Sequence, residues 1–392
     1  DIVDKILLYE KPTIEYANIL EWETKKTAGI ELPDRRFIVE TVPMDAKQIN
    51  SISEFLLQAG TEYLVFDLGR RIEPLESQTF LNIENGLHIP PFPRQKHAWF
   101  GIVFWNKNTS TQHYIWFVKL PLDEQGLVVA AARNHFLEII VDALGQSVAE
   151  DTENAQKLPD NPYSFVPNQS QLAQFNALVK HTLAQPLSEE AQKVEAYIQA
   201  PQLVDWQQIS MQSVADFVYR FSTHPKRDIL ESAIRNNASL YSSVFLDTLM
   251  EMSESVALSE HLLAIYLNEI DKCADINLAA LRGSSEGSFN TLINNKLLDL
   301  LKDEKSQRLD ILSVIAARHF EQMEPLLLSA FLEQTAKVDE KEGHQGALFA
   351  GFFSDLVQIP KLRRQVLTLL HSNANSNVLS NAFQQLFTQA RK

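Results

Sequence analysis

The sequence predicts an α+β domain at the N-terminal end of the chain and an all-α domain after it. Two observations predict this order. Between residues 98 and 145, two apolar strand-like segments precede a long amphipathic helix. From about Gln169 onward, helical apolar patterns recur with short breaks, and none of the segments has a convincing strand pattern. The 392 residues are enough for two or three domains of this kind.

Composition narrows the class of protein. Hydrophobic residues make up 45% of the chain and charged residues 22%, which are ordinary globular values. The net charge of −15 disfavours nucleic acid as a partner, because neutralising phosphates requires clustered lysines and arginines. No apolar run is long enough to span a membrane. The single cysteine, Cys273, excludes a disulfide framework, fits a cytoplasmic location and is expected to be a buried filler.

Residues 1–43 are expected to be an N-terminal extension that does not belong to the fold. They mix short apolar pieces with charge pairs and prolines, and the two candidate elements, 14–22 and 37–42, would bury little surface alone. Apolar residues recur at regular helical or strand spacing only from Met44 onward. An upstream segment, a fusion scar or a mis-set start would explain this. The alternative is a native appendage packed on the following domain.

Residues 44–147 are predicted to form an α+β head domain. Apolar residues at helical spacing indicate a helix over residues 49–56 that stops at Gly60. A strand is predicted over residues 63–66, where aromatic and apolar side chains follow one another. A short helix follows over residues 76–85.

The centre of the head domain is the stretch 98–145. In the strand over 99–105 both alternating sets of side chains are apolar, so both faces are expected to be covered. A second strand over 114–120 is expected to pair with it as a hairpin. A wide amphipathic helix follows, with Asp123 as a candidate cap and Gly145 as its end.

The rest of the chain is predicted to be helical after a linker. Residues 148–168 are polar and contain prolines, as linkers do. In the domain over 169–392, helical patterns occur at residues 170–184, 188–199, 210–222, 226–236, 240–252, 258–273, 288–302, 307–320, 323–337, 346–357, 360–372 and 376–390. This is about 35 to 40 residues per helix pair, the spacing of helical-repeat arrays. We expect an irregular HEAT-like α-solenoid, with a compact helical domain as the alternative.

The first candidate site is the DLGRR turn of the head domain. Asp67, Arg70 and Arg71 place an acid and two guanidiniums on one turn. An exposed arginine pair could clamp a carboxylate or a phosphate through bidentate hydrogen bonds. The alternative is a local ion pair in which Asp67 holds one arginine and stabilises the turn.

Three more charged residues are candidates for the same site. Lys119 is the only charge within the second hairpin strand, and Asp123 and Glu124 stand where the following helix is expected to begin. The two acids could serve acid–base chemistry or hold a cation. The structural alternative is that acids at a helix N-terminus stabilise the helix dipole.

No catalytic, metal-binding or cofactor-binding residue is assigned from the sequence, and no cofactor is expected. GSSEG at residues 283–287 fits a nucleophile elbow with Ser285, but the preceding residues have a helical pattern, which favours a loop between helices. Neither a phosphate-binding glycine loop nor an HExxH motif is present.

Four stretches resemble a known family. At TEYLVFDLGRR, PFPRQKHAWFGIVFWN, YIWFVKLPLDEQG and AARNHFLEIIVDALG the chain resembles the bacterial domain-of-unknown-function family 3549, which is typical of gammaproteobacteria. The resemblance runs from about Met44 to the C-terminus and is most specific over residues 63–145. The family carries no assigned activity, so the resemblance sharpens the boundaries and leaves the function open.

Two functions are weighed on these observations. The first is a non-enzymatic interaction or adaptor protein whose helical-repeat domain binds another protein. The second is an enzyme or small-anion-binding protein that uses the acids and arginines of the head domain. Solenoid-like spacing and the lack of a catalytic signature favour the first. Convergence of Asp67, Arg70 and Asp123 on one pocket would favour the second. The oligomeric state does not follow from the sequence.

Overall fold

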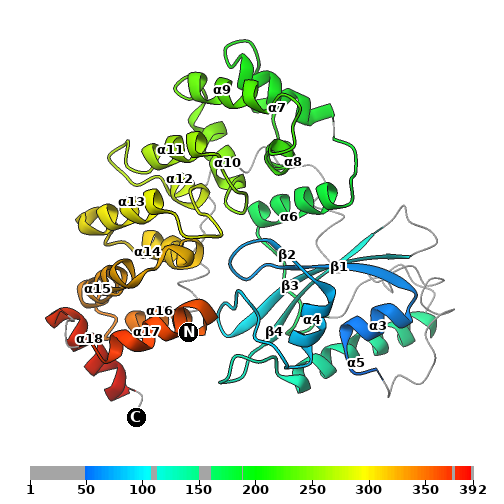
Figure 1. Cartoon of the computed structure of the whole chain (residues 1–392). Coiled ribbons are helices and arrows are strands. Elements are labelled where there is room, and N and C mark those ends of the chain that lie inside the picture. The colour runs from blue at the N-terminus through cyan, green and yellow to red at the C-terminus, as the bar shows by residue number, and fades with distance from the viewer. Residues whose placement is uncertain (1–48, 107–112, 150–159, 188, 373–375, 390–392) are drawn as a thin grey trace. The chain divides into compact units, whose positions relative to one another are not determined.

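The computed structural model describes residues 49–106, 113–149, 160–187, 189–372 and 376–389. The predicted extension at residues 1–43 lies outside this part of the chain. The described residues divide into two compact units, and we describe each by itself (Figure 1). The head unit holds those up to Asn168, and the helical unit holds those from Gln169 onward.

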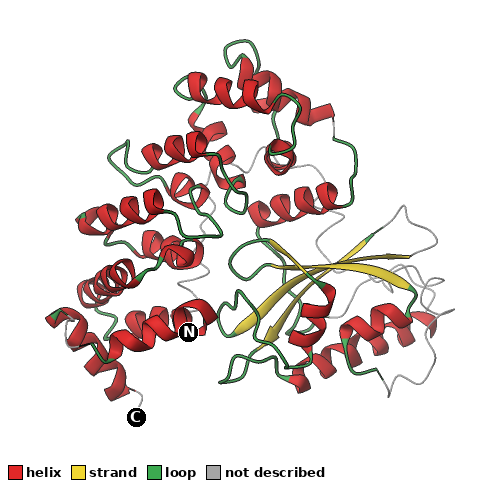
Figure 2. Ribbon diagram, in the orientation of Figure 1, coloured by secondary structure: helices red, strands yellow, loops and turns green. Residues whose placement is uncertain are grey.

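The head unit is built on a four-stranded antiparallel sheet with the strand order β2-β1-β3-β4 (Figure 2). The strands are β1 (Thr61–Asp67), β2 (Glu73–Leu75), β3 (His97–Asn106) and β4 (Tyr114–Pro121). All three predicted strands are present, and β3 and β4 pair as the expected hairpin. The sequence did not predict β2, which has three residues, one of them a proline, and therefore carries no alternating pattern.

Three described helices accompany the sheet: α3 (Ile52–Gln58), α4 (Ser77–Glu84) and α5 (Ala130–Ala149). All three were predicted. The prediction that Gly145 ends the last helix is wrong, because α5 continues to Ala149. A glycine inside a helix costs only about 1 kcal/mol relative to alanine, and the residues after Gly145 contain no helix breaker.

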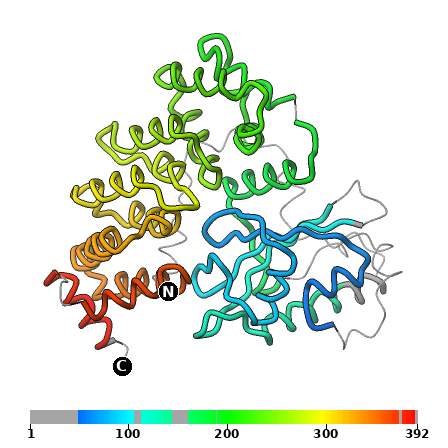
Figure 3. The backbone as a smooth tube through the Cα atoms, viewed as in Figure 1, coloured from blue at the N-terminus to red at the C-terminus, as the bar shows by residue number. Residues whose placement is uncertain are grey.

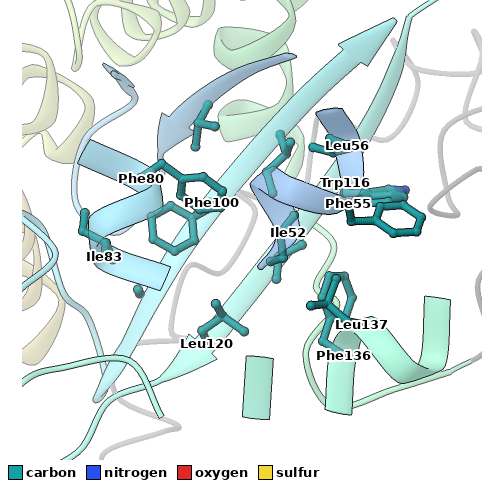
Figure 4. Packing of buried hydrophobic residues seen from close by; sticks show 14 of the residues in the cluster. Ile52, Phe55, Leu56, Phe80, Ile83, Phe100, Trp116, Leu120, Phe136 and Leu137 are labelled. Atoms are coloured by element: carbon teal, nitrogen blue, oxygen red, sulfur yellow. The ribbon is translucent and has the colours of Figure 1, made fainter. Parts of the chain in front are cut away.

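The main core of the head unit lies between the sheet and these helices (Figure 4). Trp116 of β4 is fully buried there, with its ring 4.6 Å from that of Phe104 and 6.2 Å from that of Phe55. The opposite face of the hairpin is also covered, since Trp99 and Phe117 are both at most 9% exposed. This confirms the prediction from the two apolar sets of side chains in β3.

Residues of the predicted linker contribute to that opposite face. The backbone N–H of Lys119 donates to the carbonyl of Tyr163 over 2.7 Å, and that of Phe165 donates to the carbonyl of Phe117 over 3.2 Å. The ring of Phe165 then packs edge-on against Trp99, with 4.8 Å between the ring centroids. Residues 163–165 therefore extend the sheet by a short strand-like segment beyond β4.

The described part of the helical unit contains α-helices and short 3-10 helices (Figure 2). Each of the twelve predicted segments contains an α-helix, and the short α12 corresponds to the helical pattern noted before GSSEG. The α-helices are α6 (Gln169–Thr182), α7 (Glu189–Gln199), α8 (Met211–Phe221), α9 (Arg227–Asn237), α10 (Ser243–Met252), α11 (Glu260–Glu269), α12 (Leu278–Gly283), α13 (Thr291–Lys302), α14 (Leu309–Arg318), α15 (Pro325–Glu342), α16 (Ala347–Gln358), α17 (Pro360–Leu370) and α18 (Asn377–Gln389). The 3-10 helices are η4 (Trp206–Gln208), η5 (Glu304–Ser306) and η6 (Phe320–Gln322).

Many of these helices begin at a polar residue whose side chain accepts a backbone N–H of the first turn. Ser210 caps α8, Ser259 caps α11 and Asn290 caps α13 in this way. Such caps satisfy N–H groups that have no partner inside the helix. The short breaks of the sequence pattern are therefore helix starts with a defined geometry.

Alternate helices of this unit pack against one another. One row runs α6, α8, α10, α12, α14, each helix contacting the next in the row, and we call it the α6 row. A second set pairs α7 with α9, α9 with α11, and α13 with α15. Figures 1 and 3 show the two sets side by side along the unit. None of the helices in the described ranges is both long and apolar enough to cross a membrane.

Candidate functional site

The DLGRR turn is held against the proline-rich stretch that precedes β3. Asp67 ends β1, and its Oδ1 accepts the backbone N–H of Gly69 over 2.8 Å. Arg70 donates from Nε to the carbonyl of Pro93 over 3.0 Å. A Cβ on Gly69 would lie 1.8 Å from the carbonyl oxygen of Phe92, so only glycine allows this approach.

The charged groups of the turn are buried and engaged locally. Asp67 is 1% exposed, and burial raises the pKa of its carboxyl to about 8, although the N–H groups of Gly69 and Phe92 oppose the rise. Glu73 raises this pKa further, while Arg70 lowers it. Arg71 forms an ion pair with Glu73, with 3.2 Å between Nε and Oε1.

Asp123 closes its own loop instead of capping a helix. Its Oδ1 accepts the backbone N–H groups of Gln125 and Leu127 over 2.8 and 2.9 Å. Because α5 begins only at Ala130, the prediction of Asp123 as a helix cap is wrong. An aspartate can satisfy local backbone donors in a turn as readily as at a helix start. Glu124 is exposed in the same loop.

Asp67 and Lys119 lie on opposite faces of the sheet. Asp67 pairs with Phe100, and Phe100 pairs with Val118, so these three side chains share one face. Lys119 pairs with Trp99 and therefore lies on the other face. There its Nζ is 5.6 Å from the centroid of the Trp99 ring, and the Cζ of Arg94 is 4.4 Å from it. These distances fit cation–π contacts.

Asp67→Asn is expected to flatten the pH dependence of stability. The folded-state pKa of about 8 exceeds the unfolded value of about 3.9, so the folded state binds more protons between these values. The free energy of unfolding that depends on Asp67 therefore falls as pH rises from about 4 to about 8. Asparagine is neutral and still accepts from Gly69, so the variant should gain stability over wild type at pH 8.

Thermal unfolding of both proteins at pH 5 and pH 8 measures this effect. Asp123→Asn serves as the control, because that carboxylate is exposed. An Asp67→Asn protein with the same drop in melting temperature between the two pH values as wild type would contradict the role of Asp67.

A buried ion cluster in the helical unit was missed from the sequence. Glu254, just after α10, is 3% exposed, and its Oε2 lies 2.9 Å from Nε of both Arg282 and Arg318. Gln174 donates to its Oε1 over 3.0 Å. Burial alone would raise the pKa of Glu254, but the guanidiniums of Arg282 and Arg318 hold it well below its usual range.

The partners of Glu254 come from α6, α12 and α14, so the cluster connects helices of the α6 row. A sequence signal for it exists, because Arg282 and Arg318 each lie in the last turn of a helix whose other residues are largely apolar (LAALRG and LDILSVIAAR). An arginine in such a context either points to solvent or pairs with a buried acid. Here the acid is Glu254, which lies 28 residues from Arg282 and 64 from Arg318 in the sequence.

The GSSEG segment supports the same cluster. It follows a helix, as the sequence indicated, and Ser285 is fully buried with Oγ donating to the Glu254 carbonyl over 2.7 Å. This confirms the loop interpretation over the nucleophile elbow, which requires an exposed serine after a strand.

A cavity of about 30 Å³ lies among α8, α9, α10 and α11. Most of its lining residues are apolar, and its polar members include Ser253 and Tyr266, whose hydroxyls are 3.1 Å apart. Burial raises the pKa of the Tyr266 hydroxyl to about 12. A space of this size holds about one water molecule, so we assign it no ligand.

The described residues include no group of three or more histidines, cysteines and acids placed to hold a metal ion. Cys273 is exposed in the turn after α11, so the prediction of a buried filler is wrong. The helix α11 ends at Glu269, so Cys273 lies beyond it in an exposed segment with Lys272 and Asp275.

The family described as protein of unknown function (DUF3549) matches residues 47–387. This chain belongs to the DUF3549 family. The match begins three residues after Met44, covers most of the chain and confirms the resemblance stated from the four stretches of sequence. No curated protein and no solved structure matches the chain. The DUF3549 match includes elements of both units, from α3 to α18.

Proposed function

We propose that this DUF3549 protein is a non-enzymatic interaction protein whose helical unit, an irregular HEAT-like solenoid, binds another protein. The observation that carries the proposal is the packing of alternate helices, with α6, α8, α10, α12 and α14 forming one row. In helical-repeat proteins each unit contacts mainly its neighbours, which leaves long continuous surfaces for a partner.

The Glu254 cluster supports a fixed scaffold. Its charge-assisted hydrogen bonds reach from α6 to α14, so they set the positions of helices far apart in the chain. A surface held in one geometry loses less conformational entropy on binding than a mobile one.

The contacts in the head unit support structural roles for the charged candidates there. Asp67 and Arg70 bind backbone groups of their own turn region, and Arg71 pairs with Glu73. Asp123 binds the backbone of its own loop. We therefore assign Asp67, Arg70, Arg71 and Asp123 to the stability of their turns and loops. We place the protein in the cytoplasm, as its single cysteine suggests.

Affinity capture of the tagged full-length chain tests the proposal. The chain is expressed in the organism it comes from, with and without brief cross-linking, and the cells are fractionated before capture. We expect the chain in the cytoplasmic fraction and one partner protein in near-stoichiometric amount. The tag alone is the control. Recovery of no stoichiometric partner in either preparation would contradict the adaptor function.

A further inference from the structure

We propose that the helical unit carries a docking surface at the N-terminal ends of α13 and α15 that binds a basic amphipathic segment of a partner protein. We call this region, with Phe289, Leu292 and Leu326 at its centre, the α13–α15 surface. The inference rests on the proposed function and adds the place of binding and the chemistry of the partner.

Three large apolar side chains are exposed on this surface. Phe289 is 48% exposed, Leu292 54% and Leu326 70%. Single exposed hydrophobic residues are normal, but a group of them marks interaction sites in many proteins. Phe289 and Leu292 flank the start of α13, and Leu326 is the second residue of α15.

One buried glutamine ties the two helix starts together. Gln322, fully buried before α15, donates from Nε2 to the carbonyl of Ser288 over 2.6 Å and accepts the backbone N–H of Asn290 over 2.7 Å. Its own carbonyl accepts from Nδ2 of Asn294 over 2.7 Å. Ser288 and Asn290, on either side of Phe289, are therefore hydrogen-bonded to Gln322, which lies four residues before Leu326. The helices α13 and α15 also pack against each other.

The surface is also rigid. Asn290 caps α13 by accepting the backbone N–H of Leu292 over 2.9 Å, and Pro325 occupies the first turn of α15. The residues that follow the exposed leucines, Ile293 and Leu327, are fully buried and anchor the backbone. The backbone that carries the apolar side chains is thus held in place, which lowers the entropic cost of binding.

The charges at this surface indicate the partner. Glu286 precedes Phe289 in the loop, and Glu324 precedes Leu326 and is exposed. Lys361 is paired with Glu321 at 2.8 Å, and Lys296 is paired with Asp271 at 2.7 Å. Apolar anchors flanked by carboxylates complement a segment that carries leucine-like and basic residues.

A second copy of this chain is a poorer occupant. A symmetric contact would bring Glu286 and Glu324 of one copy toward the same acids of the other, and like charges at an interface are costly. The net charge of −15 adds to this repulsion. A basic amphipathic helix has neither cost.

Binding of a labelled amphipathic leucine–lysine peptide to the full-length protein, followed by fluorescence anisotropy, tests the surface. We expect binding that weakens with added salt, and a loss of at least about tenfold in affinity for Leu326→Asp, as for other interface anchors. An acid in the first turn of α15 suits the helix dipole, so the variant should keep its melting temperature. Leu203→Asp is the matched control, because Leu203 is 87% exposed in the loop after α7.

A peptide with glutamate in place of lysine should not bind. Equal binding of the leucine–lysine peptide to wild type and Leu326→Asp would overturn the surface, as would no binding to wild type. Sedimentation that finds a dimer for the wild type and a monomer for Leu326→Asp would also overturn the proposal, because a second copy would then occupy the surface.

Repeating the affinity capture with both variants separates this inference from the proposed function. Loss of the partner with Leu326→Asp but not with Leu203→Asp supports the surface. A partner kept by both variants leaves the adaptor function standing and overturns the surface.

Discussion

Glu254→Gln is expected to lower the free energy of unfolding by about 3–5 kcal/mol, the cost of leaving buried charges without their partner. The variant keeps the size of the side chain but leaves the guanidiniums of Arg282 and Arg318, which are 13% and 9% exposed, without their shared carboxylate. Three helices of the α6 row lose their common contact. The effect should therefore appear as a large shift in the denaturant midpoint.

The pH dependence of this loss has a definite sign. Because the folded-state pKa of Glu254 is held below its usual range, its contribution to stability is present above the unfolded pKa of about 4.3. It is lost as pH falls below that value. The difference between wild type and Glu254→Gln should be largest near neutral pH and shrink below about pH 4.

Chemical denaturation at pH 7 and pH 3.5 measures both effects. Glu251→Gln is the matched control, since Glu251 lies 3.6 Å from Arg282 but is 26% exposed, and its loss should cost at most about 1 kcal/mol. Equal stabilities for the two variants at pH 7 would show that the cluster does not hold the α6 row together.

Gly283→Ala is expected to destabilise the protein by about 3 kcal/mol, at the upper end of the usual range for overpacking. Gly283 ends α12, and a Cβ there would lie 2.2 Å from the carbonyl oxygen of Met250 in α10. Backbone atoms cannot move aside as a flexible side chain can. The substitution must push α12 away from α10 and disturb the Arg282–Glu254 contact beside it.

Gly343→Ala separates this close approach from simple backbone strain. Gly343 has φ of +74° at the end of α15, and a Cβ there would meet nothing within 4 Å. Its substitution should lower the free energy of unfolding only by the strain of an alanine in the left-handed conformation, about 1–2 kcal/mol. Calorimetric unfolding of both variants checks the order, and a smaller loss for Gly283→Ala would contradict the tight packing of α10 on α12.

The helices and strands of this fold could be predicted from the sequence wherever buried residues recur at a regular spacing. In the described ranges, the long helices and the strands of five or more residues have a regular apolar pattern, since at least one side faces a core. The pattern fails for β2, whose three residues around Pro74 pair with the end of β1. The sequence also predicted the wrong role for Asp123, because an aspartate can either cap a helix or close a loop.

The candidate sites were harder to predict, for a physical reason. Pairing of Glu254 with Arg282 and Arg318 depends on tertiary contacts across 28 and 64 residues, which no local pattern records. The same holds for Gln322, whose three bonds set Phe289 beside the start of α15. The DLGRR turn was found from its charges, but the burial that raises the pKa of Asp67 was not.

Hydrogen–deuterium exchange of the full-length chain, free and bound to its captured partner, tests most directly whether the helical unit is the binding unit. We predict that binding slows exchange in the helical unit, most strongly at the amides around the starts of α13 and α15. Amides of β1 to β4 should exchange at unchanged rates. Protection confined to the head unit would contradict the account.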